Sequence, residues 1–132
     1  MGQPISVVIV DDDKLQRIIM ETLVNNSGGK VIGMGKNGKQ AIKLYKKLKP
    51  DVILLDYMMP KMGGNAAARE ILKTDPAANI VMVSGYNGNS QVVADSKEYG
   101  VLEWLTKGGG NVITMNDGIR GVLAKVDLIL NR

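Results

Sequence analysis

The sequence contains no cysteine and no histidine, and these two absences exclude several kinds of site. Without cysteine, the chain cannot form a disulfide or offer a thiolate to a metal. Without histidine, it lacks the commonest zinc ligand and the commonest general base of enzymes. Any metal bound by these side chains must therefore be a hard cation held by oxygen atoms.

Long apolar runs are also missing. No segment is apolar enough to cross a membrane, and the N-terminus lacks the charged and apolar regions of a signal peptide. The range 2–6 (GQPIS) fits a loose myristoylation pattern, but a strand predicted from Ile5 leaves little free tail for acylation. We therefore expect a cytoplasmic protein that has no membrane partner.

The length and composition suit one compact domain. The chain has 132 residues, of which 45% are apolar. A domain of this size buries roughly two-thirds of the surface that its unfolded chain exposes, so it can fold without a covalent or metal cross-link. We therefore expect residues 1–132 to form a single domain.

The net charge of +4 arises from a local excess of lysine. Six lysines are concentrated in one stretch, namely Lys36, Lys39, Lys43, Lys46, Lys47 and Lys49. No arginine or aromatic side chain on the same predicted helix face accompanies them to support contacts with bases. We interpret the stretch as a solvated helix face and expect no direct nucleic-acid binding.

Short apolar runs alternate with longer amphipathic segments along the chain. Runs of apolar and β-branched residues predict strands at 5–10, 30–34, 52–55, 80–83 and 101–105. Apolar residues at helical spacing predict helices at 15–24, 40–48, 65–73, 90–99 and 113–130. This alternation predicts an α/β fold in which helices cover both faces of a parallel sheet.

Polar side chains follow four of the predicted strands. Aspartates at 11–13 end the first strand, and Asp56 ends the third. Ser84 ends the fourth strand, and Lys107 lies near the end of the fifth. In an open parallel sheet, ligands bind outside the carboxyl ends of the strands. The sequence therefore predicts an acidic pocket that also contains one hydroxyl and one cation.

Local structure accounts for only one of these aspartates. Asp13, with Gln16 three residues later, is typical of a helix N-cap with a capping box. Asp11 and Asp12 have no such role, and Asp56 follows a buried apolar run. Two carboxylates about 4 Å apart repel by roughly 4 kcal/mol at an effective dielectric of 20. Mg²⁺ would relieve this repulsion, and a carboxylate can accept a phosphoryl group, so the pocket suits phosphoryl transfer.

Four segments of the chain carry a family resemblance that covers almost its whole length. They are VVIVDDD, NGKQAIKLYKKLKPDVILLDYMMPKMGG, IVMVSG and GVLEWLTKG. The pattern D-x-x-M-P-x-M-x-G is met by Asp56, Met59, Pro60, Met62 and Gly64. At these positions the chain resembles the receiver domains of response regulators in two-component signalling, in particular the chemotaxis regulators. The resemblance implies a flavodoxin-like, doubly wound sheet of five strands in the order 2-1-3-4-5, with five helices.

The resemblance also implies a function and a metal site. Asp56 would accept a phosphoryl group from a sensor histidine kinase or a phosphotransfer protein. Asp12, Asp56 and the backbone carbonyl of Met58 would bind Mg²⁺ directly, and Asp11 would act through a water molecule. The chain would be a signalling phosphoacceptor, and not an enzyme acting on other substrates.

Three further residues receive roles from the resemblance. Ser84 and Lys107 would each contact an oxygen of the phosphoryl group. Ser84 and the aromatic Trp104 would then move inward together, which changes a surface of the fourth helix, fifth strand and fifth helix that an unknown downstream protein reads. The chain departs from the family pattern after Lys107, where Gly108 replaces the usual proline.

Other interpretations of the same residues lead to different functions. Phosphatases of the haloacid dehalogenase type also use an aspartyl phosphate, and in that case Asp11 would be the nucleophile and Asp56 would have no role. Gly33, Gly35 and Gly38 match the G-x-G-x-x-G pattern of dinucleotide-binding folds, but the pattern follows the second predicted strand and not the first. A third interpretation is a degenerate receiver that works by protein contact without phosphorylation.

Overall fold

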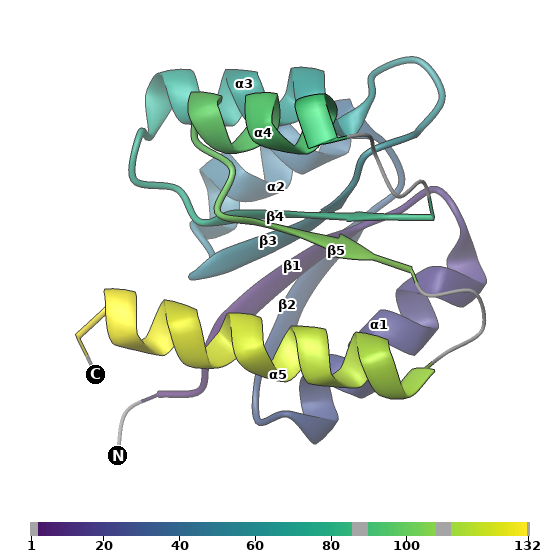
Figure 1. The fold of residues 1–132 in the computed structure, drawn as a ribbon, viewed down its shortest axis with the longest axis vertical. Coiled ribbons are helices and arrows are strands. Elements are labelled where there is room, and N and C mark those ends of the chain that lie inside the picture. Colours follow the sequence, from purple (N-terminus) through teal and green to yellow (C-terminus); the bar gives the residue numbers. More distant parts are fainter. Residues whose placement is uncertain (1–2, 86–89, 108–111, 132) are drawn as a thin grey trace.

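Strands and helices alternate along the chain and form one parallel sheet covered by helices (Figure 1). The computed structural model describes residues 3–85, 90–107 and 112–131. The strands are β1 (Ser6–Val10), β2 (Lys30–Gly35), β3 (Val52–Asp56), β4 (Ile80–Ser84) and β5 (Glu103–Thr106). They lie in the order β2-β1-β3-β4-β5, and every neighbouring pair is parallel. The expected flavodoxin-like sheet is therefore confirmed.

The helices form a layer on each face of this sheet. They are α1 (Lys14–Asn26), α2 (Gly38–Leu48), α3 (Gly64–Thr74), α4 (Ser90–Tyr99) and α5 (Val112–Ile129). Figure 1 shows α1 and α5 on one face and α2, α3 and α4 on the other. The chain is thus doubly wound, and the sheet is buried between the two helical layers.

Each face of the sheet has its own hydrophobic core. Val7 and Ile9 of β1 belong to the core under α1 and α5, whereas Val8 and Val10 belong to the core under α2 and α3. All four side chains are fully buried. This explains why β1 is a continuous β-branched run without the polar alternation of a half-exposed strand.

The fifth strand begins two residues later than the sequence predicts. The sequence predicts that Val101 and Leu102 start it, but the pairing of β5 with β4 begins at Glu103, opposite Val81. The backbone N–H of Val101 donates to the carbonyl of Ser96 at 2.9 Å, so Val101 completes the end of α4. An apolar run predicts that a strand lies in this segment, but it does not show which residues join the sheet.

The spacing of Leu15, Ile18, Ile19 and Leu23 predicts an apolar stripe on the first helix, and this prediction is only partly correct. Leu15 and Ile18 are 61% and 47% exposed, whereas Met20, Leu23 and Val24 are buried against the sheet. The error arises because apolar residues occur on more than one side of this helix, so their spacing does not decide which side faces the core.

The basic stretch lies on the surface, as the sequence predicts. All six lysines between positions 36 and 49 are exposed, whereas Tyr45 on the opposite side of α2 is buried. Within the described parts of the chain, no helix combines the length and the apolar character needed to span a bilayer.

Candidate functional site

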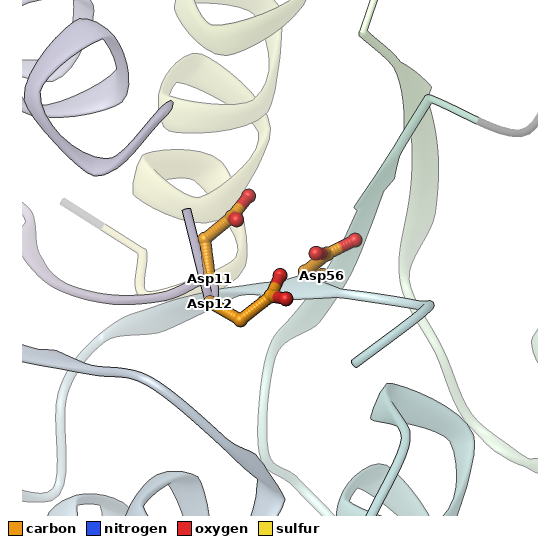
Figure 2. Close-up of side chains that lie close together, drawn as sticks. All are labelled: Asp11, Asp12 and Asp56. Carbon is orange, nitrogen blue, oxygen red and sulfur yellow. The ribbon is translucent and has the colours of Figure 1, made fainter. Parts of the chain in front are cut away.

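The carboxyl ends of β1 and β3 bring three carboxylates together. β1 and β3 are neighbours in the sheet, with Val10 opposite Leu55, so the residues after each strand end lie side by side. Asp11, Asp12 and Asp56 each offer one oxygen to a group whose members all lie within 4.8 Å of one another. Figure 2 shows their side chains gathered at this edge of the sheet. The sequence-based prediction that these residues converge is confirmed.

Asp11 is held in place from several directions. Its side chain is fully buried, and its Oδ1 accepts a hydrogen bond from the backbone N–H of Asp13 at 2.9 Å. Nη1 of Arg17 donates to the backbone carbonyl of Asp11 at 2.7 Å. Sequence reasoning did not identify Arg17, for which the only signal is a basic residue one turn into the helix that follows the aspartates. These contacts orient the Asp11 carboxylate toward the pocket.

Asp56 is a buried carboxylate in an acidic setting. It is only 4% exposed, and the backbone N–H of Met58 donates to its Oδ1 at 3.3 Å. Burial raises the pKa of Asp56 to about 6, and the charge of Asp11 adds to this effect. Lys107 and the Met58 N–H lower the pKa, but they do not offset the increase. Lys107 and the Met58 N–H therefore do not fully compensate the ionised Asp56 carboxylate for its burial and for the charge of Asp11.

Lys107 is the cation of the pocket. Its Nζ lies 2.6 Å from Oδ2 of Asp11 and 3.5 Å from Oδ2 of Asp56. The backbone N–H of Lys107 donates to the carbonyl of Ser84 at 2.7 Å, which ties the end of β5 to the end of β4. Lys107 thus reaches the carboxylates as expected, although it lies closer to Asp11 than to Asp56. Gly108, which replaces the usual proline, lies outside the described residues.

Ser84 lies at the same edge of the sheet. Asp56 is opposite Val83 in the pairing of β3 with β4, so Ser84 is one residue beyond the partner of Asp56. Ser84 is 1% exposed, which places a buried hydroxyl residue next to the acidic cluster. The hydroxyl residue expected in the acidic pocket therefore lies at the same edge of the sheet as the carboxylates.

Trp104 lies on β5 and packs toward the segment that follows Asp56. The centroids of the Trp104 and Tyr57 rings are 4.9 Å apart, with the ring planes tilted by 51°. Trp104 is half-buried, and its Nε1 has no hydrogen-bond partner among the residues that the structure describes. Trp104 thus contacts the residue that directly follows Asp56 in the chain.

A close approach of two backbones shapes the turn after β3. The N–H of Gly64 donates to the carbonyl of Tyr57 at 2.9 Å, which closes the loop between β3 and α3. A Cβ atom at Gly64 would collide with the backbone carbonyl of Asp56. The glycine that ends the family motif is therefore required for the position of Asp56.

The structure also bears on the N-cap role predicted for Asp13 and on the dinucleotide-binding interpretation. Asp13 caps α1, because its Oδ1 accepts from the backbone N–H of Leu15 at 2.9 Å. The glycines of the G-x-G-x-x-G pattern lie at the edge strand β2 and the start of α2. A Cβ at Gly33 would lie 2.8 Å from Leu48, and one at Gly38 would lie 2.5 Å from Met62. These two glycines allow close packing within the protein, and not the approach of a dinucleotide.

The donor set fits a hard divalent cation. Mg²⁺ binds oxygen at 2.0–2.1 Å, so two directly bound oxygens are at most ~4.2 Å apart. The 4.8 Å spread of the cluster leaves room for direct bonds to two carboxylates and a water-mediated contact to the third. The raised pKa of Asp56 supplies the electrostatic reason for such a cation to bind.

Comparisons with known sequences identify one protein family that matches most of the chain. The family described as the response regulator receiver domain matches residues 7–114. The chemotaxis protein CheY of Thermotoga maritima is 36% identical over 101 residues, which cover 76% of this chain and 83% of that protein. A protein-glutamate methylesterase/protein-glutamine glutaminase of Methanococcoides burtonii is 37% identical over 107 residues, which cover 80% of this chain but only 30% of that protein.

Solved structures with a similar fold include proteins of the same family. The response regulator domain of Thermotoga maritima CheB has a TM-score of 0.80 and 28% identity, with 98% of each chain covered. CheY from the CheX–CheY–BeF3–Mg²⁺ complex of Borrelia burgdorferi has a TM-score of 0.81 and 27% identity, over 98% of this chain and 91% of that chain.

Proposed function

This chain belongs to the family of response regulator receiver domains, and we propose that it accepts a phosphoryl group on Asp56 in a Mg²⁺-dependent reaction. Phosphorelay signalling is the general function of the family. The observation that supports the assignment of the acceptor is the convergence of Asp11, Asp12 and Asp56 beside Lys107. We further propose that residues 1–132 act as one receiver domain in the cytoplasm.

The proposed reaction is the attack of a carboxylate oxygen on phosphorus. An oxygen of Asp56 forms a bond to the phosphorus atom while the N–P bond of a donor phosphohistidine breaks, and the electron pair leaves with the imidazole. Asp56 must be ionised to attack, which its pKa of about 6 allows at neutral pH. The donor would be a sensor histidine kinase or a phosphotransfer protein. The chain itself would catalyse only its own phosphorylation and its slow dephosphorylation.

The other residues of the pocket would bind and neutralise the transferred group. Asp12, Asp56 and the backbone carbonyl of Met58 would hold Mg²⁺, with Asp11 acting through water. The bound ion would offset the negative charge of the phosphoryl oxygens. Lys107, which lies 3.5 Å from Asp56, would pair with one phosphoryl oxygen, and the hydroxyl of Ser84 would donate to another.

We propose that the same contacts transmit the signal. A phosphoryl group adds about −1.5 to −2 charges, so it would draw the hydroxyl of Ser84 and the amine of Lys107 toward Asp56. Trp104, which packs on Tyr57 next to the acceptor, would respond to this movement. The surface of α4, β5 and α5 would change with it and be recognised by a downstream protein.

The proposal is tested by phosphorylating the purified chain with acetyl phosphate and measuring its intact mass. With Mg²⁺, we expect the wild-type protein to gain one phosphoryl group and Asp56→Asn to gain none. Removal of Mg²⁺ with EDTA should prevent labelling. Asp13→Asn is the matched control, because Asn also caps helices and the Asp13 side chain binds the α1 backbone outside the acidic cluster. It should be labelled like the wild type.

Two results would contradict the proposal. Labelling of Asp56→Asn to the same extent as the wild type would show that another residue is the acceptor. A folded wild-type chain that binds Mg²⁺ but takes no phosphoryl group from any donor would support the degenerate receiver instead.

A further inference from the structure

Two hollows between α3 and α4 lie outside the acidic pocket, and both are lined by Arg69 and Tyr99. The larger has a volume of about 580 Å³, and the smaller of about 120 Å³. The larger is also lined by the apolar side chains of Met62, Ala66 and Leu72. Its size falls in the range that small ligands occupy, roughly 300–1,000 Å³.

The charged side chains that line the larger hollow differ in how their charges are balanced. Glu70 and Lys73 form an ion pair at 2.9 Å, so their charges offset each other. The guanidinium of Arg69 lies 4.1 Å from the centre of the Tyr99 ring. Among the residues that the structure describes, Arg69 makes no ion pair with a carboxylate. Its stacking on Tyr99 orders the guanidinium without using its N–H donors.

The hydroxyl of Tyr99 is the second polar group that matters here. Its oxygen is buried and forms no hydrogen bond within the described ranges. Burial raises the pKa of Tyr99, and this outweighs the lowering effect of Arg69, so the hydroxyl stays protonated at neutral pH. A buried polar group without a hydrogen bond carries a cost in stability. A ligand that supplied an acceptor here would recover part of that cost.

We propose that the larger hollow binds a small amphipathic anion, whose apolar body packs on Met62, Ala66 and Leu72 and whose carboxylate binds Arg69. A carboxylate can receive two parallel N–H bonds from a guanidinium, which makes arginine a better ligand for it than a point charge. An acceptor oxygen next to Arg69 would also lie near Tyr99, because the two side chains are stacked. The site is therefore specific for an apolar compound with one negative head group.

The position of this site connects it to the switch residues. Tyr57 lines the smaller hollow together with Arg69 and Tyr99. Its ring contacts Trp104, and it directly follows Asp56 in the chain. Binding next to Tyr99 would therefore alter the surroundings of Trp104, the one tryptophan of the chain. The inference goes beyond the proposed function, because binding at α3 and α4 does not require phosphorylation of Asp56.

The test is a titration of the full chain with octanoate, followed by NMR of methionine and alanine methyl groups and by the emission of Trp104. We expect shifts at Met62 and Ala66, a change in Trp104 emission, and saturation at millimolar octanoate. Arg69→Gln should weaken binding by about tenfold or more, which corresponds to about 1.4 kcal/mol. Arg120→Gln is the matched control, since it removes an exposed arginine from α5, and it should bind like the wild type.

The head group and the hollow are tested separately. Octylammonium has the same apolar body with the opposite charge, and we expect it to produce no saturable shift at Met62 or Ala66. Ala66→Glu adds a negative charge at an exposed position of α3 and should abolish octanoate binding. It also replaces Arg69→Gln as the decisive variant if the latter does not fold.

Several outcomes would overturn the proposal. These are the absence of saturable shifts with octanoate, equal binding of octylammonium, or unchanged affinity in both Arg69→Gln and Ala66→Glu. Phosphorylation of Asp56 is measured independently by intact mass, so failure of this site leaves the proposed function untouched.

Discussion

The carboxyl group of Asp56 is buried among charges that oppose one another. Burial and Asp11 raise its pKa to about 6, whereas Lys107 and the N–H of Met58 lower it. A carboxyl group with a raised pKa binds its proton more tightly in the folded protein than in the unfolded chain. Without a metal, ionised Asp56 therefore lowers the stability of the fold, and this cost develops as pH rises toward the pKa of about 6 and is complete above it.

Replacement of Asp56 by asparagine should stabilise the metal-free protein at alkaline pH. One pKa unit is worth 1.36 kcal/mol, so we expect Asp56→Asn to raise the free energy of unfolding by about 1–3 kcal/mol at about pH 8. The wild type should lose stability as pH rises from about 4 to about 6, because in this range Asp56 is ionised in the unfolded chain and largely protonated in the folded protein. The gain should vanish below about pH 4, where Asp56 is protonated in both states. Urea unfolding in EDTA, at alkaline and at acid pH, measures the free energy of unfolding of the wild type and of Asp56→Asn.

The control for this prediction is Asp117→Asn. Its side chain is 68% exposed on α5, so its removal should change stability little at either pH. If Asp56→Asn were less stable than the wild type at about pH 8, the assigned cost of the buried charge would be wrong.

At the scale of elements, β3 and α3 position the acceptor through the loop that joins them. Gly64 starts α3 directly against the backbone of Asp56, with no space for a side chain. Its N–H also bonds the carbonyl of Tyr57 at 2.9 Å. The bond to Tyr57 and the close approach to Asp56 thus fix the start of α3 beside the end of β3, which keeps the Asp56 carboxylate at the edge of the sheet.

Gly64→Ala should disturb this junction. The added methyl group collides with the Asp56 carbonyl, and such overpacking costs about 1–3 kcal/mol. We expect a matching loss in the free energy of unfolding and weaker labelling of Asp56 by acetyl phosphate. Gly121→Ala is the control, because a Cβ at Gly121 in α5 meets no atom within 4 Å. It should raise stability by up to about 1 kcal/mol, since alanine favours a helix over glycine.

At the scale of the whole molecule, the parallel sheet gathers residues that are far apart in the sequence. Asp11, Asp56 and Lys107 come from the ends of three strands and meet within one pocket. Folding brings the carboxylates together despite their mutual repulsion, with Lys107 offsetting part of it. A divalent cation bound at this pocket would therefore stabilise the fold as a whole.

Mg²⁺ should raise the thermal stability of the wild-type protein. At ten times its dissociation constant, a ligand that binds only the folded state adds about 1.4 kcal/mol. We expect Asp12→Asn to lose this gain, because Asp12 is the exposed carboxylate of the cluster and would bind the ion directly. Asp13→Asn should keep it. Thermal unfolding with Mg²⁺ and with EDTA, at equal ionic strength, provides the comparison; an equal gain in Asp12→Asn would argue against this site.

Most of the fold was predictable because its signals are local. Apolar runs and helical spacing identified every strand and helix, and the largest differences occur at the end of α1, the start of α2 and the start of β5. At the last of these, Val101 bonds to Ser96 of α4. The sequence did not decide which side of α1 is buried, because Leu15 and Ile18 are as apolar as the residues that face the sheet. Local patterns therefore predict whether a segment is a helix or a strand better than they predict where it begins or which of its sides is buried.

The sequence alone determined which residues could form the site, because strand ends of a parallel sheet lie on one edge whatever the details of packing. Only the tertiary structure decided how they interact. The preference of Lys107 for Asp11 and the contact of Arg17 with the Asp11 carbonyl depend on side-chain directions across separate elements. The packing of Trp104 on Tyr57 depends on the placement of β5 next to β4. Such contacts join residues distant in sequence, and no local pattern encodes their geometry.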